Sequence, residues 1–436
     1  MSNKLAILGG KPLRNKDFES RKTIRDNEIN AVNKVLNRGI LSDFLANPGN
    51  FFYGGDYVKK FEKKWSEKYN YKHSVTVNSA TSALIAAVGA IGVSAGDEVI
   101  CTPYSMSASA TCVLFYGAIP IFIDIDRNNL AINTNLIEQK ITSKTKAIIV
   151  VHLFGCPADM DKIVTIAKKY KLKIIEDCSQ SPGATYKEKY VGTLGDIGCF
   201  SLNYHKHIHT GEGGILVTNN DEYALKLRLI RNHAEGAFTY YGLDDPLNMH
   251  GANFRLTELQ AAIGIEQIKK IDNYLQHRRS LANHLDDIVE EFNFLETIYP
   301  KEYKVEHSYY LYPIRFIESN VGISRELFIK AINCELHDDS IEGTALYGGY
   351  VKPIYLMDYF QYQTDNNKRC FPFSYVDESN FIDNYKNGSC EVVESMYKKE
   401  LIFTPLIRES ITTNDIDDFK KVITKVYNQR ECLKDL

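Results

Sequence analysis

The sequence contains neither a long apolar run nor a recognisable targeting segment. Its strongest apolar stretch, Ala147–Phe154, has the length of one buried strand, whereas a membrane span needs about 18 consecutive apolar residues. The opening residues, Met1–Leu8, are too few for a signal peptide. We therefore expect no membrane-spanning helix and no membrane partner.

The sequence also lacks the cysteine pairs that build metal sites and disulfide frameworks. Its nine cysteines are odd in number and scattered, and no Cys-x-x-Cys pair occurs. Zinc ribbons and small disulfide-rich domains need closely spaced, paired cysteines. We therefore expect a reducing, cytoplasmic location and no structural metal.

Neither sign of charge is in excess. The chain of 436 residues has 52 basic and 55 acidic residues, a formal net charge of −3, which gives no reason to expect a nucleic acid partner. Hydrophobic residues make up 44% of the chain, enough to exclude a disordered protein. Tryptophan is almost absent, with one residue beside 28 tyrosines and 21 phenylalanines.

Short apolar strands alternate with helical patterns in the first part of the chain. The expected strands, near-continuously apolar, are 75–77, 98–101, 119–125, 147–153 and one starting at 173. The expected helices are 82–91, 107–116, 136–141 and 160–170. This rhythm predicts an α/β fold with a parallel sheet covered on both faces.

The pattern changes after Arg255. A long helical pattern from Leu256 to about Phe292 is followed by an expected strand at 309–315 and helices at 326–333 and 416–427. The aromatic-rich stretch 343–388 has no regular pattern, and we expect it to be irregular. The sequence therefore predicts a large α/β domain, residues 1–262, and a smaller C-terminal α+β domain, residues 263–436.

A lysine with the surroundings of a cofactor site lies in Gly198–Gly214. Lys206 stands there between an apolar strand and a glycine-rich turn, and Asp177 closes the preceding apolar strand. Ser79–Ser82 opens a helix after a strand, where backbone N–H groups favour a phosphate. Each feature alone could be a surface lysine, a turn cap or an ordinary N-cap. Together they are what an enzyme that uses pyridoxal 5'-phosphate (PLP) needs.

At these motifs the sequence resembles the DegT/DnrJ/EryC1/StrS family of PLP-dependent sugar aminotransferases. The resemblance runs from Leu8 to about Tyr427. The motifs that carry it are Ile175–Gln180, Phe200–Ser201 before Lys206, Thr210–Gly214, and Gly251–Arg255 followed by Glu258–Gln260. It implies the fold type I architecture of aspartate aminotransferase, a mainly parallel seven-stranded sheet and a smaller C-terminal domain.

The resemblance also implies roles for individual residues. Lys206 would bind the cofactor covalently and shuttle protons, Asp177 would pair with the pyridine nitrogen, and Gln180 would approach the ring hydroxyl. The phosphate would be held by Ala80, Thr81 and Ser201. Asn253 would reach the phosphate bound by the neighbouring subunit, so that a homodimer shares its active sites.

Two positions depart from the family pattern. The family usually has glycine where Ala80 stands, which makes the phosphate loop bulkier here. It usually stacks an aromatic ring on the cofactor from the segment matching Tyr104–Ala108, and Met106 stands at that position. Either the Met106 thioether packs on the ring, or Tyr104 takes this role, or the alignment shifts by one or two residues.

The histidines around Lys206 leave two further alternatives open. Some relatives replace the lysine with histidine and are sugar dehydratases, and a slip of one residue would place His205 or His207 at the reactive position. On an extended strand, His205, His207 and His209 would share one face and could bind a metal. The spacing to Ser201 and to the glycine-rich turn favours Lys206 as the reactive residue and no metal.

The function implied by the resemblance is transfer of an amino group, from glutamate in most of the family, to a keto or aldehydo sugar. The sugar would be nucleotide-linked or phosphorylated, and the product would enter a surface polysaccharide or a secondary metabolite. A PLP-dependent sugar dehydratase and a non-catalytic PLP-binding regulatory protein are the alternatives. Some of the many tyrosines would then line a polar sugar pocket or a dimer surface.

Overall fold

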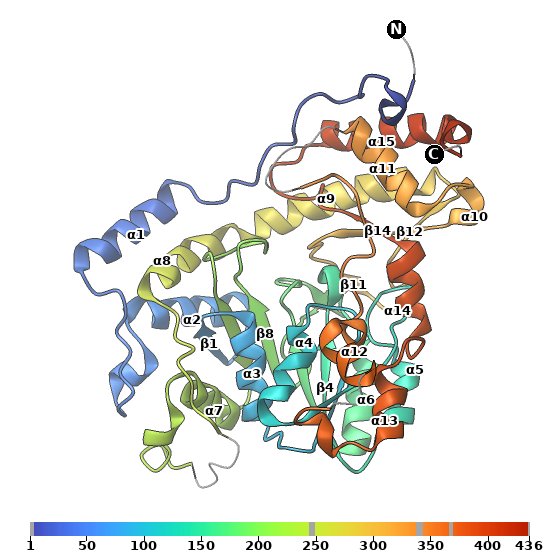
Figure 1. Cartoon of the computed structure of the whole chain (residues 1–436). Coiled ribbons are helices and arrows are strands. Elements are labelled where there is room, and N and C mark those ends of the chain that lie inside the picture. The colour runs from blue at the N-terminus through green and yellow to red at the C-terminus, as the bar shows by residue number, and fades with distance from the viewer. Residues whose placement is uncertain (1–3, 244–248, 337–342, 366–368, 435–436) are drawn as a thin grey trace.

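The computed structural model describes residues 4–243, 249–336, 343–365 and 369–434. A seven-stranded sheet with its helices forms the lower part of the molecule in Figure 1, and a four-stranded sheet with helices forms the upper part. The helices α8 (Glu258–Gln267) and α9 (Ile271–Glu290) run across the junction between the two parts. The predicted long helical pattern is thus two helices, joined by the 3-10 turn Ile268–Lys270.

The large sheet has the strand order β1-β9-β8-β5-β4-β2-β3. All its strands run parallel except β9, which is antiparallel to both of its neighbours. This confirms the predicted mainly parallel seven-stranded sheet. The strands are β1 (His73–Val77), β2 (Glu98–Cys101), β3 (Ile119–Phe122), β4 (Thr145–Val151), β5 (Lys173–Asp177), β8 (Ile197–Ser201) and β9 (Gly214–Thr218).

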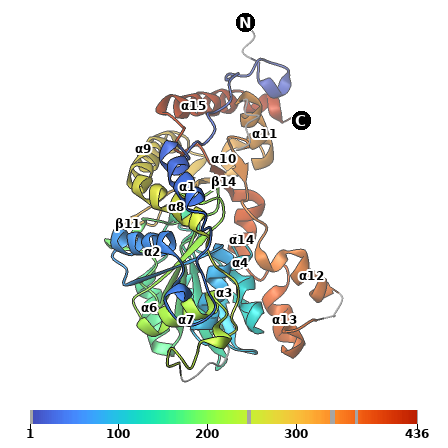
Figure 2. The ribbon, with the colours of Figure 1, turned by 90° about the vertical axis from the view of Figure 1, so that its left-hand side faces the viewer.

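Helices cover both faces of this sheet, which explains why its strands are apolar throughout. In Figure 2, α3 (Ala80–Ala90) and α4 (Ala108–Thr111) lie on one side of the sheet, and α2 (Asp56–Tyr69) and α6 (Met160–Tyr170) lie on the other. Almost every residue of α3 is buried, and most of them are small. Small side chains let this helix lie close to β5, β8 and β9. The remaining helices of this part are α1 (Asp26–Arg38), α5 (Thr134–Ile137) and α7 (Asp221–Arg231).

A second hydrophobic core lies around the antiparallel sheet β10-β12-β14-β13. The N-terminal residues Leu5 and Phe18 are buried in this core, although they begin the chain. The strands are β10 (Leu295–Thr297), β12 (Tyr312–Phe316), β13 (Tyr347–Gly348) and β14 (Leu401–Thr404), and the helices beside α9 are α10 (Glu318–Val321), α11 (Arg325–Glu335) and α15 (Thr413–Asn428). A small third sheet joins β6 (Thr185–Tyr186), β7 (Lys189–Tyr190) and β11 (Val305–Glu306).

The aromatic-rich stretch is more regular than the sequence indicates. It contains the helices α12 (Asp358–Asp365) and α13 (Glu378–Tyr385), and α14 (Glu391–Ser395) follows. The expectation of an irregular stretch is therefore wrong for its described part. Tyr355, Phe360 and Tyr385 are buried in the core of the large sheet, where they pack on Phe122 of the edge strand β3. The division of the chain at residue 262 stays a prediction, because segments from both ends cross it.

None of the described helices has the length and apolar character needed to cross a membrane. All nine cysteines are free thiols, and most are buried.

We expect Tyr385→Ala to lower the free energy of unfolding by about 3–5 kcal/mol, as other large-to-small changes in aromatic cores do. Tyr385 is fully buried, stacks on Phe360 with 5.3 Å between ring centroids, and donates a hydrogen bond to the Pro120 carbonyl oxygen at 2.6 Å. Urea unfolding measures the change. The control Tyr375→Ala removes a tyrosine that is 76% exposed and should change stability by less than about 0.5 kcal/mol. Equal effects would contradict the packing role.

Candidate active site

The predicted site residues meet at one edge of the large sheet. Asp177 ends β5 and Ser201 ends β8, and these two strands pair side by side. Gly214 begins the antiparallel β9 at the same edge, opposite Ser201 on one side and Val77 on the other. The carboxyl ends of parallel strands are where α/β folds place their ligands.

The start of α3 forms a close-fitting backbone cradle at this edge. Ser79 caps the helix by accepting a hydrogen bond from the Ser82 N–H at 3.0 Å. A Cβ atom on Gly214 would lie 2.6 Å from the Ser79 carbonyl oxygen, so only glycine permits this approach. Ala80 and Thr81 occupy the first turn of α3, where backbone N–H groups lack intrahelical partners. This arrangement is suited to an anion.

Asp177 is buried and held by hydrogen bonds to both carboxylate oxygens. The Ser109 hydroxyl donates to Oδ2 at 2.7 Å, and the Ser179 N–H donates to Oδ1 at 3.0 Å. Ser105 lies 3.0 Å from the Ser109 hydroxyl and extends this network. A buried carboxylate held so firmly can face a cationic or N–H partner without reorganising. Ser109 lies in the expected helix 107–116 and Ser105 just before it, but no sequence pattern connects them with Asp177.

Gln180 is fixed by two partners from distant segments. Its Oε1 accepts a hydrogen bond from the Phe154 N–H at 2.7 Å, and its Nε2 donates to the Tyr350 hydroxyl at 2.9 Å. Phe154 also accepts a hydrogen bond from the Tyr310 N–H through its carbonyl oxygen, at 2.7 Å. Gln180 is therefore connected through Phe154 to the segment that lies against Lys206.

Lys206 is buried, with 8% of its surface exposed, and its amine lies 4.2 Å from the centre of the Tyr310 ring. Among the described residues no carboxylate forms an ion pair with this amine. Ser201, five residues earlier, accepts a hydrogen bond from the Asn203 N–H at 3.2 Å and so shapes the start of the turn that carries the lysine. The amine is thus positioned by an aromatic face, which attracts a cation without neutralising it.

The N-terminal segment holds the lysine turn in place. Arg21 donates hydrogen bonds to the carbonyl oxygens of Tyr204 at 2.9 Å, His207 at 2.7 Å, and Lys206. Its Nε lies 3.2 Å from Glu409, which follows β14. Sequence patterns did not indicate Arg21, because its partners lie more than 180 residues away.

The three histidines around Lys206 lie in different environments. His205 is exposed, His207 bonds the Ser308 carbonyl oxygen at 2.9 Å, and His209 bonds the Thr23 hydroxyl at 2.8 Å. Burial lowers the pKa of His207 well below its ordinary value and that of His209 to about 4. Both rings are therefore neutral at physiological pH and serve to pack and anchor the turn.

The described residues contain one other cluster of metal-ligand type, His152, Glu176 and Cys178, and its geometry is that of a closed hydrogen-bond network. His152 Nε2 lies 3.0 Å from Glu176, and His152 Nδ1 accepts the Ala158 N–H at 3.1 Å. Glu176 also accepts backbone N–H groups from Gly192 and Gly195. Both ring nitrogens are occupied, so the cluster supports the strand ends rather than an ion.

The two residues considered for stacking on a cofactor ring, Tyr104 and Met106, differ in their exposure. Tyr104 is fully buried, and its hydroxyl donates to the Gly349 carbonyl oxygen at 2.6 Å, so its ring is part of the core. Met106 is 55% exposed and lies two residues before the start of α4, at the same edge of the sheet. The structure thus leaves the Met106 thioether accessible, and its role against a cofactor ring stays a prediction.

The Gly251–Arg255 segment lies beside the start of α3 in its own chain. The Asn78 N–H donates to the Phe254 carbonyl oxygen at 2.9 Å, and the side chain of Asn253 is exposed. Arg255 Nε donates to Asn232 at 2.8 Å, a structural contact. The predicted contact of Asn253 with a second subunit stays a prediction.

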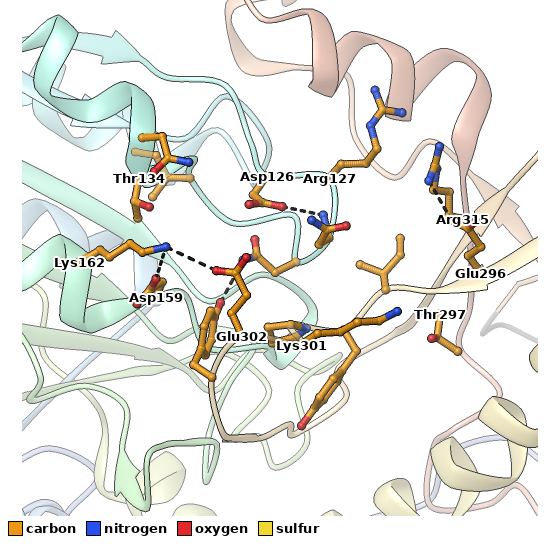
Figure 3. A pocket seen from close by; sticks show the side chains of 18 of the residues that line it. Asp126, Arg127, Thr134, Asp159, Lys162, Glu296, Thr297, Lys301, Glu302 and Arg315 are labelled. Carbon is orange, nitrogen blue, oxygen red and sulfur yellow. Dashed lines mark hydrogen bonds and ion pairs between the residues drawn. The ribbon is translucent and has the colours of Figure 1, made fainter.

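Two cavities differ in size, and only the smaller one adjoins the predicted site residues. A cavity of about 600 Å³ lies between β10 and the loop around Asp126. Figure 3 shows that its charged lining residues pair with one another: Lys162 lies 3.1 Å from Asp159, and Arg315 lies 2.8 Å from Glu296. None of the predicted site residues lines it. A smaller cavity of about 190 Å³ adjoins the lysine turn, since Tyr204 and His205 of that turn line it. Tyr310 also lines this cavity.

The tyrosines divide among several environments. Tyr204, Tyr310 and Tyr347 line the small cavity, whereas Tyr309 and Tyr312 are buried in the second core. Tyrosines that line a sugar pocket or a dimer surface therefore stay a hypothesis, and Tyr309 and Tyr312 are core packing.

The family model described as the DegT/DnrJ/EryC1/StrS aminotransferase family matches residues 23–376. This match covers most of the chain, and the chain therefore belongs to this family of aminotransferases. The family recognised from the motifs is confirmed.

Three similar proteins show the extent of the likeness. GDP-perosamine synthase of Escherichia coli O157:H7 is 39% identical over 260 residues, 60% of this chain and 70% of that protein. UDP-4-amino-4,6-dideoxy-N-acetyl-beta-L-altrosamine transaminase of Campylobacter jejuni subsp. jejuni serotype O:23/36 (strain 81-176) is 35% identical over 312 residues, 71% of this chain and 79% of that protein. The X-ray structure of the aminotransferase from Psychrobacter cryohalolentis covers 94% of this chain and 99% of that chain, with 28% identity and a TM-score of 0.79. The predicted fold type I architecture is confirmed.

The neutral burial of His209 predicts a pH-dependent stability. In the unfolded chain this histidine takes up a proton below its ordinary pKa of 6.5, whereas in the folded protein its pKa is about 4. Its contribution is therefore complete above pH 6.5 and is lost as the pH falls towards 4. When the pH falls from about 7.5 to about 5.5, the wild-type protein should therefore lose about 1.4 kcal/mol more of its unfolding free energy than the His209→Gln variant loses.

Urea unfolding at several pH values measures this difference. His205→Gln, which changes an exposed ring in the same turn, is the matched control and should keep the wild-type pH dependence. If both variants lost stability with acid as wild type does, His209 would not be buried in its neutral form.

Proposed function

We propose that this protein is a PLP-dependent aminotransferase that moves an amino group from glutamate to a keto or aldehydo sugar. The observation that carries the proposal is the buried Lys206 amine at the same sheet edge as the buried carboxylate Asp177 and the backbone cradle at Ala80. The product would be an amino sugar for a surface polysaccharide or a secondary metabolite.

The residues present fit PLP. The cradle that a Cβ on Gly214 would fill offers N–H groups to a phosphate, together with Thr81 and Ser201. Asp177 offers a fixed carboxylate to a protonated ring nitrogen, and Gln180 and Met106 lie at the same edge. When bound, PLP supplies an electron sink and a temporary carrier for the amino group.

The chain's own residues supply positioning and proton transfer. Lys206 Nζ is the group that takes the proton from the α-carbon of the donor and returns one in the opposite half-reaction. Arg21 fixes the lysine turn and Tyr310 contacts the amine, so that the amine is already oriented when the substrate binds. The hydrogen bonds to Asp177 keep its charge directed at one point during both half-reactions.

The names of the relatives support a nucleotide-linked sugar substrate. Two of the similar proteins are named for sugars of this kind, GDP-perosamine synthase for a GDP-linked sugar and UDP-4-amino-4,6-dideoxy-N-acetyl-beta-L-altrosamine transaminase for a UDP-linked amino sugar. We further propose a homodimer in which Asn253 of each subunit reaches the phosphate bound by the other, since this side chain is exposed beside the start of α3.

We expect Lys206→Ala to abolish the visible absorption of lysine-bound PLP and to lower amino transfer by at least about 10³-fold, because it removes both the covalent anchor and the base. Spectra of the purified holoenzyme measure the first effect. Formation of 2-oxoglutarate from glutamate with a panel of nucleotide-linked keto sugars measures the second. Lys189→Ala, on an exposed strand, is the control. A persistent absorption band would mean that another lysine carries the cofactor.

Subunit mixing tests the shared site. Dimers formed from Lys206→Ala and Asn253→Ala chains contain one native site if Asn253 acts across the interface, and after full exchange the mixture should recover roughly a quarter of wild-type activity. Mixing Lys206→Ala with Asp177→Ala chains is the control and should recover none, because both residues serve the same subunit's site. If the first mixture also recovered none, Asn253 would act within its own chain.

A further inference from the structure

Gln180 is a buried amide with one hydrogen left over. Its side chain is 3% exposed. A backbone N–H can only donate, so the bond from the Phe154 N–H at 2.7 Å identifies the accepting atom as Oε1. The other end is therefore the NH2 group, which donates one hydrogen to the Tyr350 hydroxyl at 2.9 Å. Among the described residues the second amide hydrogen has no acceptor, and a buried donor without a partner indicates a place for a ligand.

Both partners of Gln180 have an unusual backbone conformation. Phe154 has a φ of +55° and Tyr350 a φ of +53°, in the left-handed region that bulky side chains rarely adopt. Such a conformation costs free energy and persists only where the surrounding structure enforces it. Strained residues gather at functional sites, and here two of them from distant segments meet on one amide.

The turn that carries Tyr350 is held by the residues packed around it. Gly349, the residue before it, donates its N–H to the Leu401 carbonyl oxygen at 2.9 Å and accepts a hydrogen bond from the Tyr104 hydroxyl at 2.6 Å. A Cβ atom on Gly349 would lie 2.4 Å from the Tyr397 carbonyl oxygen, and its φ is +70°, so this position requires glycine. The chain after β13 is thus fixed in the conformation that brings Tyr350 to Gln180.

The Tyr350 ring lies where the two parts of the molecule meet. Its centroid is 4.8 Å from that of Phe154, which follows β4 of the large sheet, and 5.8 Å from that of Phe403 in β14 of the second core. Edge-to-face packing of this kind restricts the ring. The hydroxyl is therefore held against Gln180 by contacts from both cores.

The Tyr350 hydroxyl is neutral at physiological pH. Burial raises the pKa of Tyr350 and that of Tyr104, whose rings lie 6.1 Å apart. The other titratable groups near Tyr350 are Asp177 and Tyr310. Because the phenol keeps its proton and its ring is fixed, its oxygen is a constant acceptor for the Gln180 amide.

We propose that Tyr350 is a positioning residue for the cofactor, which holds Gln180 so that the remaining amide hydrogen faces the ring hydroxyl of PLP. This inference rests on the proposed function, and it adds to the role of Gln180 a residue from the aromatic-rich segment that no sequence motif indicated. Tyr350 acts through Gln180 and does not touch the reacting atoms. Since Tyr350 and Gln180 belong to different sheets, the site is complete only when the two parts of the chain are packed together.

The arrangement has a consequence that absorption spectra can measure. A hydrogen bond donated to the ring oxygen of PLP favours the anionic form of that oxygen. It therefore lowers the pH at which lysine-bound PLP gives up its proton, which changes the visible absorption. An amide already fixed by Phe154 and Tyr350 makes this bond without first being ordered.

A pH titration of the visible absorption of the holoenzyme tests the inference. Tyr350→Phe removes the hydroxyl and keeps the ring, and it should raise the midpoint by roughly 0.5 to 1 pH unit, the effect of weakening one hydrogen bond. Gln180→Ala should raise the midpoint at least as far. Tyr385→Phe, which removes a buried hydroxyl beside the outer strand β3, is the control and should leave the midpoint unchanged.

A double variant shows whether Tyr350 acts through Gln180. In a Gln180→Ala background, Tyr350→Phe should leave the midpoint where Gln180→Ala alone places it. An equal shift in both backgrounds would mean that Tyr350 acts on the ring directly, and it would overturn the positioning role. Should Gln180→Ala fail to bind PLP, Gln180→Leu, which keeps a side chain of similar size, takes its place.

The spectra also separate this inference from the proposed function. A loaded Tyr350→Phe enzyme with the wild-type midpoint would overturn the positioning role, even if urea unfolding showed it to be less stable, because lost packing alone does not move the midpoint. A wild-type enzyme that bound PLP but transferred no amino group from any amino acid would overturn the proposed function, and the midpoints would still decide the role of Tyr350. A wild-type protein that formed no band of lysine-bound PLP would overturn both.

Discussion

The contact of Arg21 with the lysine turn is the interaction that the rest of the active site depends on. One guanidinium from the N-terminal segment bonds successive carbonyl oxygens of the turn and at the same time meets Glu409 after β14. It therefore fixes the turn that carries Lys206 relative to both cores, which are built from segments far apart in the chain. Tyr310, which follows the junction helices, completes this arrangement by placing its ring under the amine. The position of Lys206 is thus a property of the assembled fold.

The parts of the fold that could be predicted were those with local signals. The apolar strands from Val75 to Asp177 indicated a parallel sheet, and the structure has them in one. Lys206, Asp177 and Gln180 lie in short motifs whose spacing is visible in the sequence, and all three lie at the carboxyl edge of that sheet or in the turns that follow it. Each motif is made of neighbouring residues, and their combination along the chain, with the family resemblance, gave the predicted roles.

The parts that could not be predicted depend on contacts between distant segments. Arg21 and Ser109 have no periodic or motif context, and their partners lie on other elements. The helices α12 and α13 are too short to be stable alone and form against the edge of the large sheet. Their aromatic sequence showed no helical period from which they could be predicted. His207 and His209 looked like a ligand set, because side-chain direction in a turn cannot be read from alternate spacing.

The aromatic segment over β3 covers an edge of the large sheet that could otherwise pair with a strand of another chain. β3 is an outer strand, and Pro120 within it lacks the N–H group that a neighbouring strand would require. The Pro120 carbonyl oxygen is instead taken by the Tyr385 hydroxyl, and rings from α12 and α13 lie across the strand. An uncovered edge would be a template for strand addition by another chain. The segment therefore covers this edge of the sheet and leaves it unsuited to pairing with a strand of another chain.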